Sequence, residues 1–326
     1  MKPSRRSVLM GLWVLYLSGA PLVVEAQQAR VYRVGVVLQG GPYSLAIDGL
    51  QAGLRELGFE EGKQFVLHVQ DAKGDLKLAE AAAKVFEQEN VDLIYAVTSS
   101  VAFVVKRATK NVPIVFYAGT DPVASGLVES FRKPGGRLTG THGHYADLGA
   151  KRLELLKEMV PKLRRVVTFY RAENAVYQQN ARIARDAAQR LQVELVERRI
   201  ASVEELRVGL RALRPGEADA LLVIDSIMIA QSELVVETGK AKRLPTMFED
   251  RGSVAKGGLA SYGVDYYAAG RLSAKQVQRI LLGANPGDLP VEQVDRVHLG
   301  INLKTARALG LTIPQSVLVR ADEVIE

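Results

Sequence analysis

The side chains best suited to chemistry in this sequence are hydroxyl, amide, acidic and tyrosine groups at the ends of short apolar runs. In chain order they are Gln39, Thr98, Ser99, Ser100, Thr120, Asp121, Tyr170, Asn174, Asp225, Glu249, Tyr262 and Asp265. Hydroxyls and free N–H groups at a helix N-terminus suit a carboxylate. We therefore expect these residues to bind a small polar ligand, such as an amino acid or a small carboxylate.

Several of these residues also have a simpler structural interpretation. Thr98-Ser99-Ser100 is the strongest candidate for a carboxylate cradle, but the same residues are equally typical of a helix N-cap. Asp121 precedes Pro122 and is typical of a turn, while Asp225 is typical of a cap on its own helix. The residue types alone leave both interpretations open.

A zwitterionic ligand would use both halves of the chain. Its carboxylate would meet the hydroxyls of the first half, and its ammonium group is predicted near Asp225 or Asp265 of the second half. Tyr170 and Tyr262 would supply aromatic walls.

The sequence motifs of common enzyme classes are missing from this chain. It contains no G-x-S-x-G elbow, no phosphate-binding G-x-x-x-x-G-K-[ST] loop and no G-x-G-x-x-G after a strand. Gly40-Gly41 lacks the third glycine of a dinucleotide-binding loop. The chain has no cysteine, which excludes disulfides, thiolate metal sites and cysteine nucleophiles. We predict no enzymatic activity, no catalytic residue and no cofactor.

Histidines offer one weak metal motif. His142-x-His144 has the types that chelate a metal, but no carboxylate or further histidine stands at ligand spacing. A structural role is therefore the favoured interpretation, and we predict no metal site.

Composition is typical of a folded protein of two domains. The chain has 326 residues, of which 48% are hydrophobic and 24% charged. Its formal net charge of +7 is scattered along the sequence and forms no Lys/Arg-rich patch. We therefore expect no nucleic-acid partner.

The N-terminus has the features of an export signal. Lys2, Arg5 and Arg6 precede an apolar run over 8–24, and small residues lead up to Ala26. We predict a signal peptide over 1–26, cleaved after Ala26, and a location in the periplasm. A membrane anchor is the alternative, but the uninterrupted apolar stretch is shorter than the roughly 20 residues that span a bilayer. The sequence leaves the secretory and twin-arginine routes open.

One α/β pattern occurs twice, at an offset of about 130 residues. Predicted strands of the first copy cover 34–38, 65–69, 91–97 and 112–117, with helical patterns between them. Predicted strands of the second copy cover 165–170, 193–199, 218–224 and 244–248. Alternation of strands and helices favours two similar doubly wound lobes, each built on a parallel sheet.

The remaining chain does not form a third copy. It contains a predicted strand at 257–263, a helix over 266–282, and a strand near 294–300. We assign 27–140 plus 265–292 to an N-terminal lobe and 141–264 plus 293–326 to a C-terminal lobe. Shared connections between the lobes would act as a hinge.

Several stretches carry a more specific signal. They include GLQAGLRELGF at 49–59, VPIVF at 112–116, GLASYG at 258–263 and INLKTARALGLTIP at 301–314. They resemble the ABC-transporter substrate-binding family that includes tryptophan-binding-like proteins. This resemblance covers nearly all of the chain after the predicted signal peptide.

The resemblance implies a type I periplasmic-binding-protein fold with three crossover segments, near 138–144, 259–264 and 291–301. It implies a solute-binding protein that closes on a small-molecule ligand and delivers it to an ABC permease and its ATPase. We expect a monomer. The resemblance does not name the ligand, and it leaves an extracytoplasmic ligand-sensing module as the alternative. A secreted α/β enzyme is a further rival.

Overall fold

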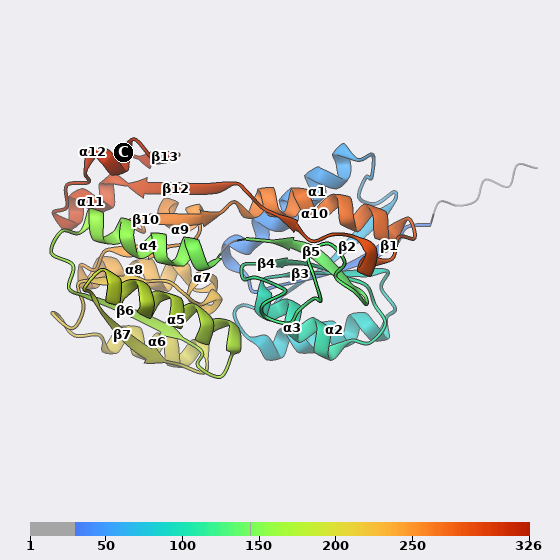
Figure 1. The fold of residues 1–326 in the computed structure, drawn as a ribbon, viewed down its shortest axis with the longest axis horizontal. Helices are drawn as coiled ribbons and strands as arrows, with labels where there is room; N and C mark the ends of the chain where they lie inside the picture. Colours follow the sequence, from blue (N-terminus) through green and yellow to red (C-terminus); the bar gives the residue numbers. More distant parts are fainter. Residues whose placement is uncertain (1–29, 144) are drawn as a thin grey trace, which may run out of the picture. The chain divides into compact units, whose positions relative to one another are not determined.

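The apolar runs of the chain form two separate β-sheets, each flanked by helices (Figure 1). This computed structural model describes residues 30–143 and 145–326, and Val31–Glu326 forms one unit in which both sheets lie. The predicted signal peptide over 1–26, with its cleavage point after Ala26, lies outside the described residues.

The first sheet has the strand order β11-β5-β4-β3-β1-β2, and each neighbouring pair is parallel. Its strands are β1 (Tyr32–Leu38), β2 (Phe65–Asp71), β3 (Leu93–Val97), β4 (Ile114–Ala118), β5 (Leu138–His142) and β11 (Glu292–Gln293). Its helices are η1 (Gly41–Ser44), α1 (Leu45–Glu56), α2 (Leu76–Gln88), α3 (Ser99–Ala108), α10 (Tyr266–Leu281) and η2 (Pro286–Asp288). Every residue of β3 and β4 is buried because helices cover both faces of the sheet.

The second sheet has the order β13-β12-β10-β9-β8-β6-β7. Its strands are β6 (Arg165–Tyr170), β7 (Glu194–Arg199), β8 (Ala220–Leu222), β9 (Thr246–Phe248), β10 (Ala260–Val264), β12 (Val297–Asn302) and β13 (Glu323–Ile325). Its helices are α4 (Tyr145–Met159), α5 (Ala175–Arg190), α6 (Val203–Ala212), α7 (Ser226–Ala230), α8 (Ser232–Lys242), α9 (Arg251–Ala255), α11 (Leu303–Leu309) and α12 (Gln315–Leu318).

The two sheets share one topology. The order β2-β1-β3-β4-β5 of the first reappears as β7-β6-β8-β9-β10 in the second. This confirms the predicted fold class of two similar doubly wound lobes. One pair departs from the parallel pattern, since β12 runs antiparallel to β10. β10 leaves the second lobe toward the first, whereas β12 returns from it, so the two strands must run in opposite directions.

Three connections join the lobes, as predicted for this fold class. They link β5 to α4, β10 to α10, and β11 to β12. The sequence-based boundaries at 140/141 and 292/293 fall within β5 and β11, which pair with one another, and the boundary at 264/265 falls at the end of β10.

Glycines fix α10 to the first lobe by close contact with α1. A Cβ atom on Gly49 would lie 2.0 Å from the backbone oxygen of Tyr267, and one on Gly270 would lie 1.9 Å from that of Ala46. No larger residue fits at either position without separating the helices. The segment 266–281 is therefore packed onto the lobe that begins the chain.

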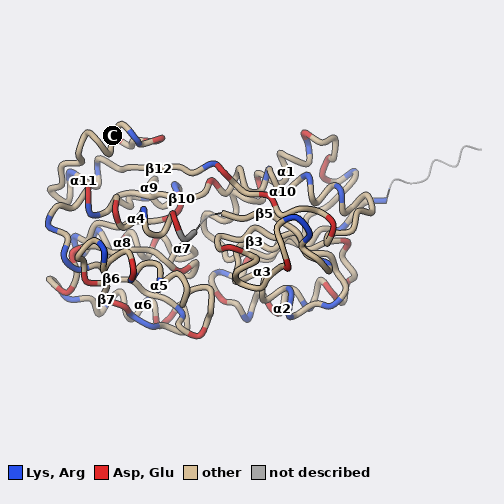
Figure 2. Tube along the Cα trace, viewed as in Figure 1, with Lys and Arg blue, Asp and Glu red and all other residues tan. Residues whose placement is uncertain are grey.

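Charged side chains are distributed over both lobes without a continuous basic stretch (Figure 2). Among the described residues, no helix combines the length and the apolar character needed to cross a bilayer.

Candidate functional site

The carboxyl ends of the two sheets surround a small cavity of about 40 Å³. Ligands of parallel α/β sheets bind at these strand ends, where loops and helix N-termini meet. The cavity is lined by Tyr43, Thr98, Ser99, Ser100, Tyr117, Gly119, Thr120 and Tyr266 from the first lobe, and by Val176, Tyr177, Asn180, Ile224, Ser226 and Glu249 from the second.

Glu249 occupies one wall of the cavity and is surrounded by tyrosines. It follows β9, and its Oε1 accepts hydrogen bonds from the hydroxyls of Tyr266 at 3.0 Å and Tyr43 at 3.3 Å. Its Oε2 lies 3.3 Å from the guanidinium of the buried Arg152. The rings of Tyr43 and Tyr266 are 4.9 Å apart between centroids, and that of Tyr117 lies 5.8 Å from Tyr266. A carboxylate beside several aromatic rings is an arrangement that suits a cation.

These tyrosines remain neutral hydrogen-bond donors. Burial raises the pKa of Tyr43, Tyr117 and Tyr266 above the usual value, and the negative charge of Glu249 raises each further. Their hydroxyls therefore keep their protons and donate toward Glu249 or a ligand.

The start of α3 supplies hydroxyls on the opposite, first-lobe wall. The Ser99 hydroxyl lies 2.8 Å from that of Thr120 and accepts from the Thr120 backbone N–H at 3.2 Å. Thr98 caps α3 and adopts φ +102°, a conformation that a β-branched residue rarely takes. Such strain, of order 1–3 kcal/mol, persists where the surroundings impose it, and it clusters at binding sites.

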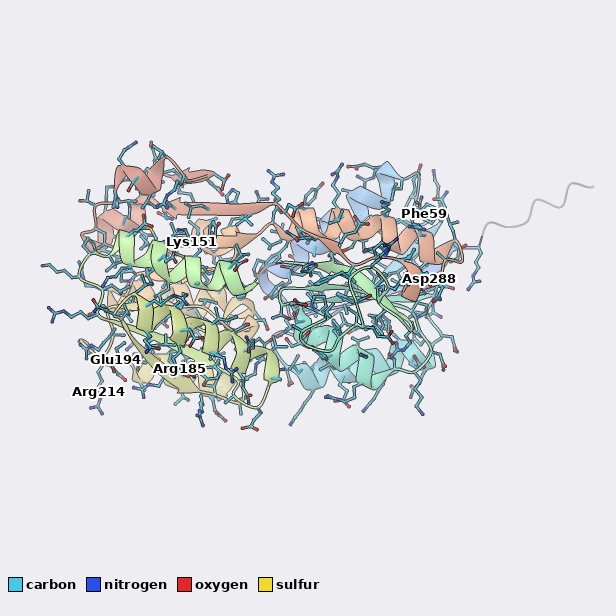
Figure 3. The ribbon with its side chains drawn as sticks, viewed as in Figure 1. Phe59, Lys151, Arg185, Glu194, Arg214 and Asp288 are labelled. Carbon is cyan, nitrogen blue, oxygen red and sulfur yellow. The ribbon has the colours of Figure 1, made fainter. Side chains whose placement is uncertain are left out.

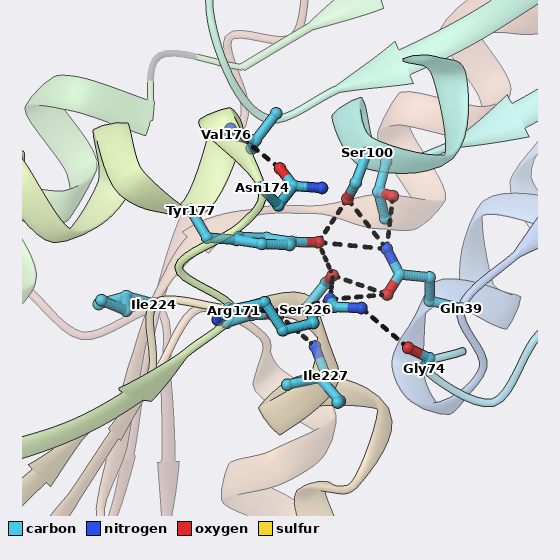
Figure 4. Close-up of polar contacts among 12 residues, drawn as sticks. Gln39, Gly74, Ser100, Arg171, Asn174, Val176, Tyr177, Ile224, Ser226 and Ile227 are labelled. Carbon is cyan, nitrogen blue, oxygen red and sulfur yellow. Dashed lines mark hydrogen bonds and ion pairs between the residues drawn. The ribbon is translucent and has the colours of Figure 1, made fainter. Parts of the chain in front are cut away.

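Below the cavity, Gln39 of the first lobe contacts several residues of the second lobe (Figure 4). Its Oε1 accepts from the Ser226 hydroxyl at 2.8 Å and from Arg171 at 3.3 Å. Its amide nitrogen donates to Thr98 at 3.0 Å within its own lobe. The Tyr177 hydroxyl bridges the lobes as well, with contacts to Ser226 and to Ser100 of α3. All of these side chains are buried.

Arg171 and Asp225 support this interlobe network. The Arg171 guanidinium binds Asp225 at 2.6 Å, donates to the Gly74 carbonyl oxygen of the first lobe at 2.9 Å, and lies 4.6 Å from the Tyr177 ring centroid. Asp225 also caps α7 by accepting from the Ile227 N–H. The two Asp225 oxygens accept four hydrogen bonds in all. Three come from the backbone N–H, Nε and Nη2 of Arg171, and one comes from the Ile227 N–H. Its acceptor sites are thereby filled within the protein.

The structure brings part of the predicted residue set together. Thr98, Ser99, Ser100, Thr120 and Glu249 line the cavity. Gln39 lies directly behind it and bonds to Thr98 and Ser100. Asp225 joins the same network through Arg171.

Asp121, Asn174 and Asp265 lie apart from the cavity and serve as local caps. The Asp121 carboxylate accepts from the backbone of a turn, Asn174 caps α5, and Asp265 caps α10 beside Arg296.

Tyr170 and Tyr262 also lie apart from the cavity. The Tyr170 hydroxyl donates to Glu197 of β7, which in turn binds Arg185. Arg185 lies on α5 (Figure 3). Tyr170 points this way because successive residues of a strand face opposite sides of the sheet. Tyr262 contributes its backbone oxygen, which accepts from Arg152.

Sequence reasoning missed the tyrosines Tyr43, Tyr117, Tyr177 and Tyr266, together with Asn180, and it gave Arg171 no role in the site. Tyr117 and Arg171 stand at strand ends. The rule that polar residues at strand ends line the ligand site, which was used for their neighbours, also applies to them. Tyr177 and Asn180 lie in the first and second turns of α5, where a strand-end search does not look.

Two larger depressions lie away from the strand ends. One of about 880 Å³ is lined by β7 and α6, and one of about 620 Å³ by residues around α8 and α11. Both are open to solvent, and charged residues such as Arg198 and Glu217 in the first pair with each other. The strand-end cavity, with its buried polar groups from two lobes, is the better candidate.

His142, one member of the weak metal motif, packs its ring 4.8 Å from Phe131 at the end of β5. His144 lies outside the described residues. Within the described ranges, no group of three or more acidic, histidine or cysteine residues is arranged to hold a metal ion.

Comparison with known proteins identifies the family of this chain. Residues 33–325 match the model of the family described as ABC transporter substrate binding protein. The chain belongs to that family. The substrate-binding chain is 31% identical over 264 residues to the tyrosine-binding protein of Clostridioides difficile, covering 81% of this chain and 76% of the relative.

Solved structures agree with this assignment. The substrate-binding chain is similar to an ABC domain from Streptococcus pneumoniae in complex with L-Trp, with a TM-score of 0.82, 27% identity, and coverage of 91% of this chain and 100% of the other. It is also similar to a ligand-free, open substrate-binding protein with adhesive properties from Clostridium difficile. That match has a TM-score of 0.61, 27% identity, and coverage of 90% and 99%.

Proposed function

We propose that this protein is the extracytoplasmic solute-binding component of an ABC importer and that it binds an aromatic L-amino acid between its lobes. The observation that carries the proposal is the cavity at the strand ends, where Glu249 and three tyrosine rings face the hydroxyls at the start of α3. Two proteins similar to this chain are a tyrosine-binding protein and a domain solved in complex with L-Trp, which supports the same ligand class.

The two charged ends of the ligand have distinct partners in this proposal. Its ammonium group binds Glu249, where the faces of Tyr43 and Tyr266 add cation–π attraction. Its carboxylate binds the hydroxyls of Ser99 and Thr120, beside the N-terminus of α3. Asp225 does not take the ammonium group because its oxygens already accept four hydrogen bonds.

Binding involves closure of the lobes about the three connections. A cavity of about 40 Å³ is far smaller than the roughly 300–1,000 Å³ typical of small-molecule sites, so the lobes must separate to admit an amino acid. The direct contacts from Gln39 to Ser226 and Arg171 indicate a closed arrangement. The better match to the L-Trp complex, at a TM-score of 0.82, than to the open protein, at 0.61, supports the same view.

In this role the protein is a periplasmic monomer that docks on an ABC permease, and the ATPase of the importer drives that permease. The predicted export signal and the family of the chain support this arrangement. The closed lobes would be the form that the permease recognises, because a ligand that contacts both lobes favours closure by its differential contact energy.

Isothermal titration of the chain from residue 27 onward, first stripped of bound solute, tests this function. We expect at least one of L-tyrosine, L-tryptophan and L-phenylalanine to bind with a dissociation constant in the micromolar range or below. Glu249→Gln should weaken binding about tenfold or more by removing the charge opposite the ammonium group. If none of the three binds the wild type, the proposed ligand class is wrong.

A further inference from the structure

Asn180 is the cavity residue whose hydrogen bonds are incomplete. It lies on α5, is 4% exposed, and lines the cavity beside Val176 and Ile224. Its amide nitrogen donates to the backbone oxygen of Ile224 at 2.9 Å. Because a carbonyl oxygen can only accept, this contact fixes the orientation of the amide and places Oδ1 on the other side.

The Oδ1 atom of Asn180 is a buried acceptor with no hydrogen-bond partner among the described residues. Other buried side-chain atoms share this property, such as those of His68, Thr168 and Ser261, but these residues do not line the cavity. Leaving a buried acceptor unpaired destabilises the protein, so such groups call for an explanation. A ligand that brings a donor into the cavity provides one.

The position of Asn180 relative to Glu249 indicates which part of the ligand it meets. Glu249 follows β9, whereas α5 packs on β6 and β7, and β8 lies between these strands in the sheet. The two residues therefore reach the cavity from opposite sides of β8. A ligand that binds Glu249 with its ammonium group and spans the cavity would therefore reach Asn180 with its other end.

Two aliphatic residues line the cavity beside Asn180. Val176 and Ile224 contribute aliphatic carbons on either side, which suits an aromatic ring. The phenol of tyrosine and the indole of tryptophan each carry one donor at the ring edge, whereas phenylalanine carries none.

We propose that Asn180 determines specificity by accepting a hydrogen bond from the ring-edge donor of the ligand. The protein accordingly selects aromatic amino acids that carry an O–H or N–H group over phenylalanine. This inference rests on the proposed function. A site built to pair with a ligand donor rejects the analogue that lacks it, because the acceptor is then buried unpaired.

The test compares affinities for L-tyrosine, L-tryptophan and L-phenylalanine in the wild type, Asn180→Leu and Asn180→Ser. Wild type should bind tyrosine or tryptophan about ten- to a hundredfold more tightly than phenylalanine. Both variants should lose most of that ratio, chiefly through weaker binding of the donor-bearing ligand. Because the ratio is taken within each variant, it does not depend on what fraction of the protein is folded.

Gln179→Leu is the matched control, since it removes an amide from the neighbouring, exposed position of α5. It should keep the wild-type ratio. An unchanged ratio in both Asn180 variants would overturn the inference, as would a wild type that binds phenylalanine as tightly as the other two. In either case, binding of the amino acids leaves the proposed function standing. If the wild type binds none of the three amino acids, both the inference and the proposed function are overturned.

Discussion

Arg171 binds Asp225 within the second lobe at 2.6 Å and, with the same guanidinium, reaches the Gly74 carbonyl oxygen of the first lobe at 2.9 Å. One ion pair thus stabilises a lobe and also takes part in the contact between lobes. Both side chains are buried, with exposed fractions of 8% and 0%. A buried pair of this kind is expensive to break because the remaining charge stays desolvated.

Arg171→Met should therefore lower the free energy of unfolding by about 3–5 kcal/mol, measured by urea denaturation. Asp225 would then remain buried without a counter-ion. Arg185→Met is the matched control, because the Arg185–Glu197 pair is 53% and 22% exposed, and its loss should cost less than about 1 kcal/mol. Equal effects of the two substitutions would contradict this account.

Gly41 should be required for closure. It adopts φ +59°, and a Cβ atom there would lie 2.9 Å from the Ile229 backbone oxygen of the second lobe. Gly41→Ala should weaken ligand binding about tenfold or more, by titration, because the closed form acquires a clash that the open form lacks.

Gly58→Ala is the control for Gly41→Ala, because it introduces the same kind of backbone strain without a clash between the lobes. Gly58 also has a positive φ, +83°, but a Cβ atom there would meet nothing within 4 Å. This control should lose stability without losing affinity. A similar loss of affinity in both variants would show that the interlobe contact of Gly41 does not matter.

Gln39 and Ser226 should be energetically coupled across the lobes. Gln39→Ala and Ser226→Ala each remove the 2.8 Å hydrogen bond between them, so their effects on ligand affinity should not add. The double-mutant cycle should give a coupling energy of about 0.5–3 kcal/mol. Strict additivity would mean that the contact contributes nothing to closure.

Asp250 should make stability depend on pH. Burial raises its pKa from the usual value of 3.8 to about 6, against the opposing effect of its hydrogen bonds to Ser253. Between these two values the folded state holds a proton that the unfolded state has released. The contribution of Asp250 to the free energy of unfolding should therefore fall as the pH rises from about 4 to about 6, by at most about 3 kcal/mol.

Asp250→Asn should flatten that dependence, since the amide does not titrate. Urea denaturation between pH 4 and pH 7 measures the slope in both proteins. The same slope in the wild type and in the variant would contradict the raised pKa of Asp250.

Much of the architecture could be predicted because its signals are local. Continuous apolar runs such as 93–97 and 114–118 mark strands buried on both faces, and their repetition marks the second lobe. β13 was not identified because the short strand at Glu323–Ile325 gives a weak pattern. α6 was also missed, although Ser202 caps it and Leu206 and Leu210 are buried at helical spacing, so its signal was present in the sequence.

The site was harder to predict because its geometry depends on long-range contacts. The hydroxyls at 98–100 follow from their place after β3, but Asn180 enters the cavity through its contact with Ile224, 44 positions further along the chain. Tyr170 shows the opposite failure. It stands at a strand end, yet strand alternation directs it to Glu197. The side of the sheet to which a strand-end side chain points can be predicted only when the elements packed beside it are known.

The close fit of Gly49 and Gly270 makes the first lobe discontinuous in sequence. Five of the six strands of its sheet have been synthesised by residue 142. The surface of α1 that contacts α10 stays uncovered until residues 266–281 have been synthesised. During synthesis the lobe that starts the chain must wait for most of the second lobe to follow. A fragment ending before α10 should therefore expose an apolar surface and aggregate, whatever the intrinsic strength of its strands.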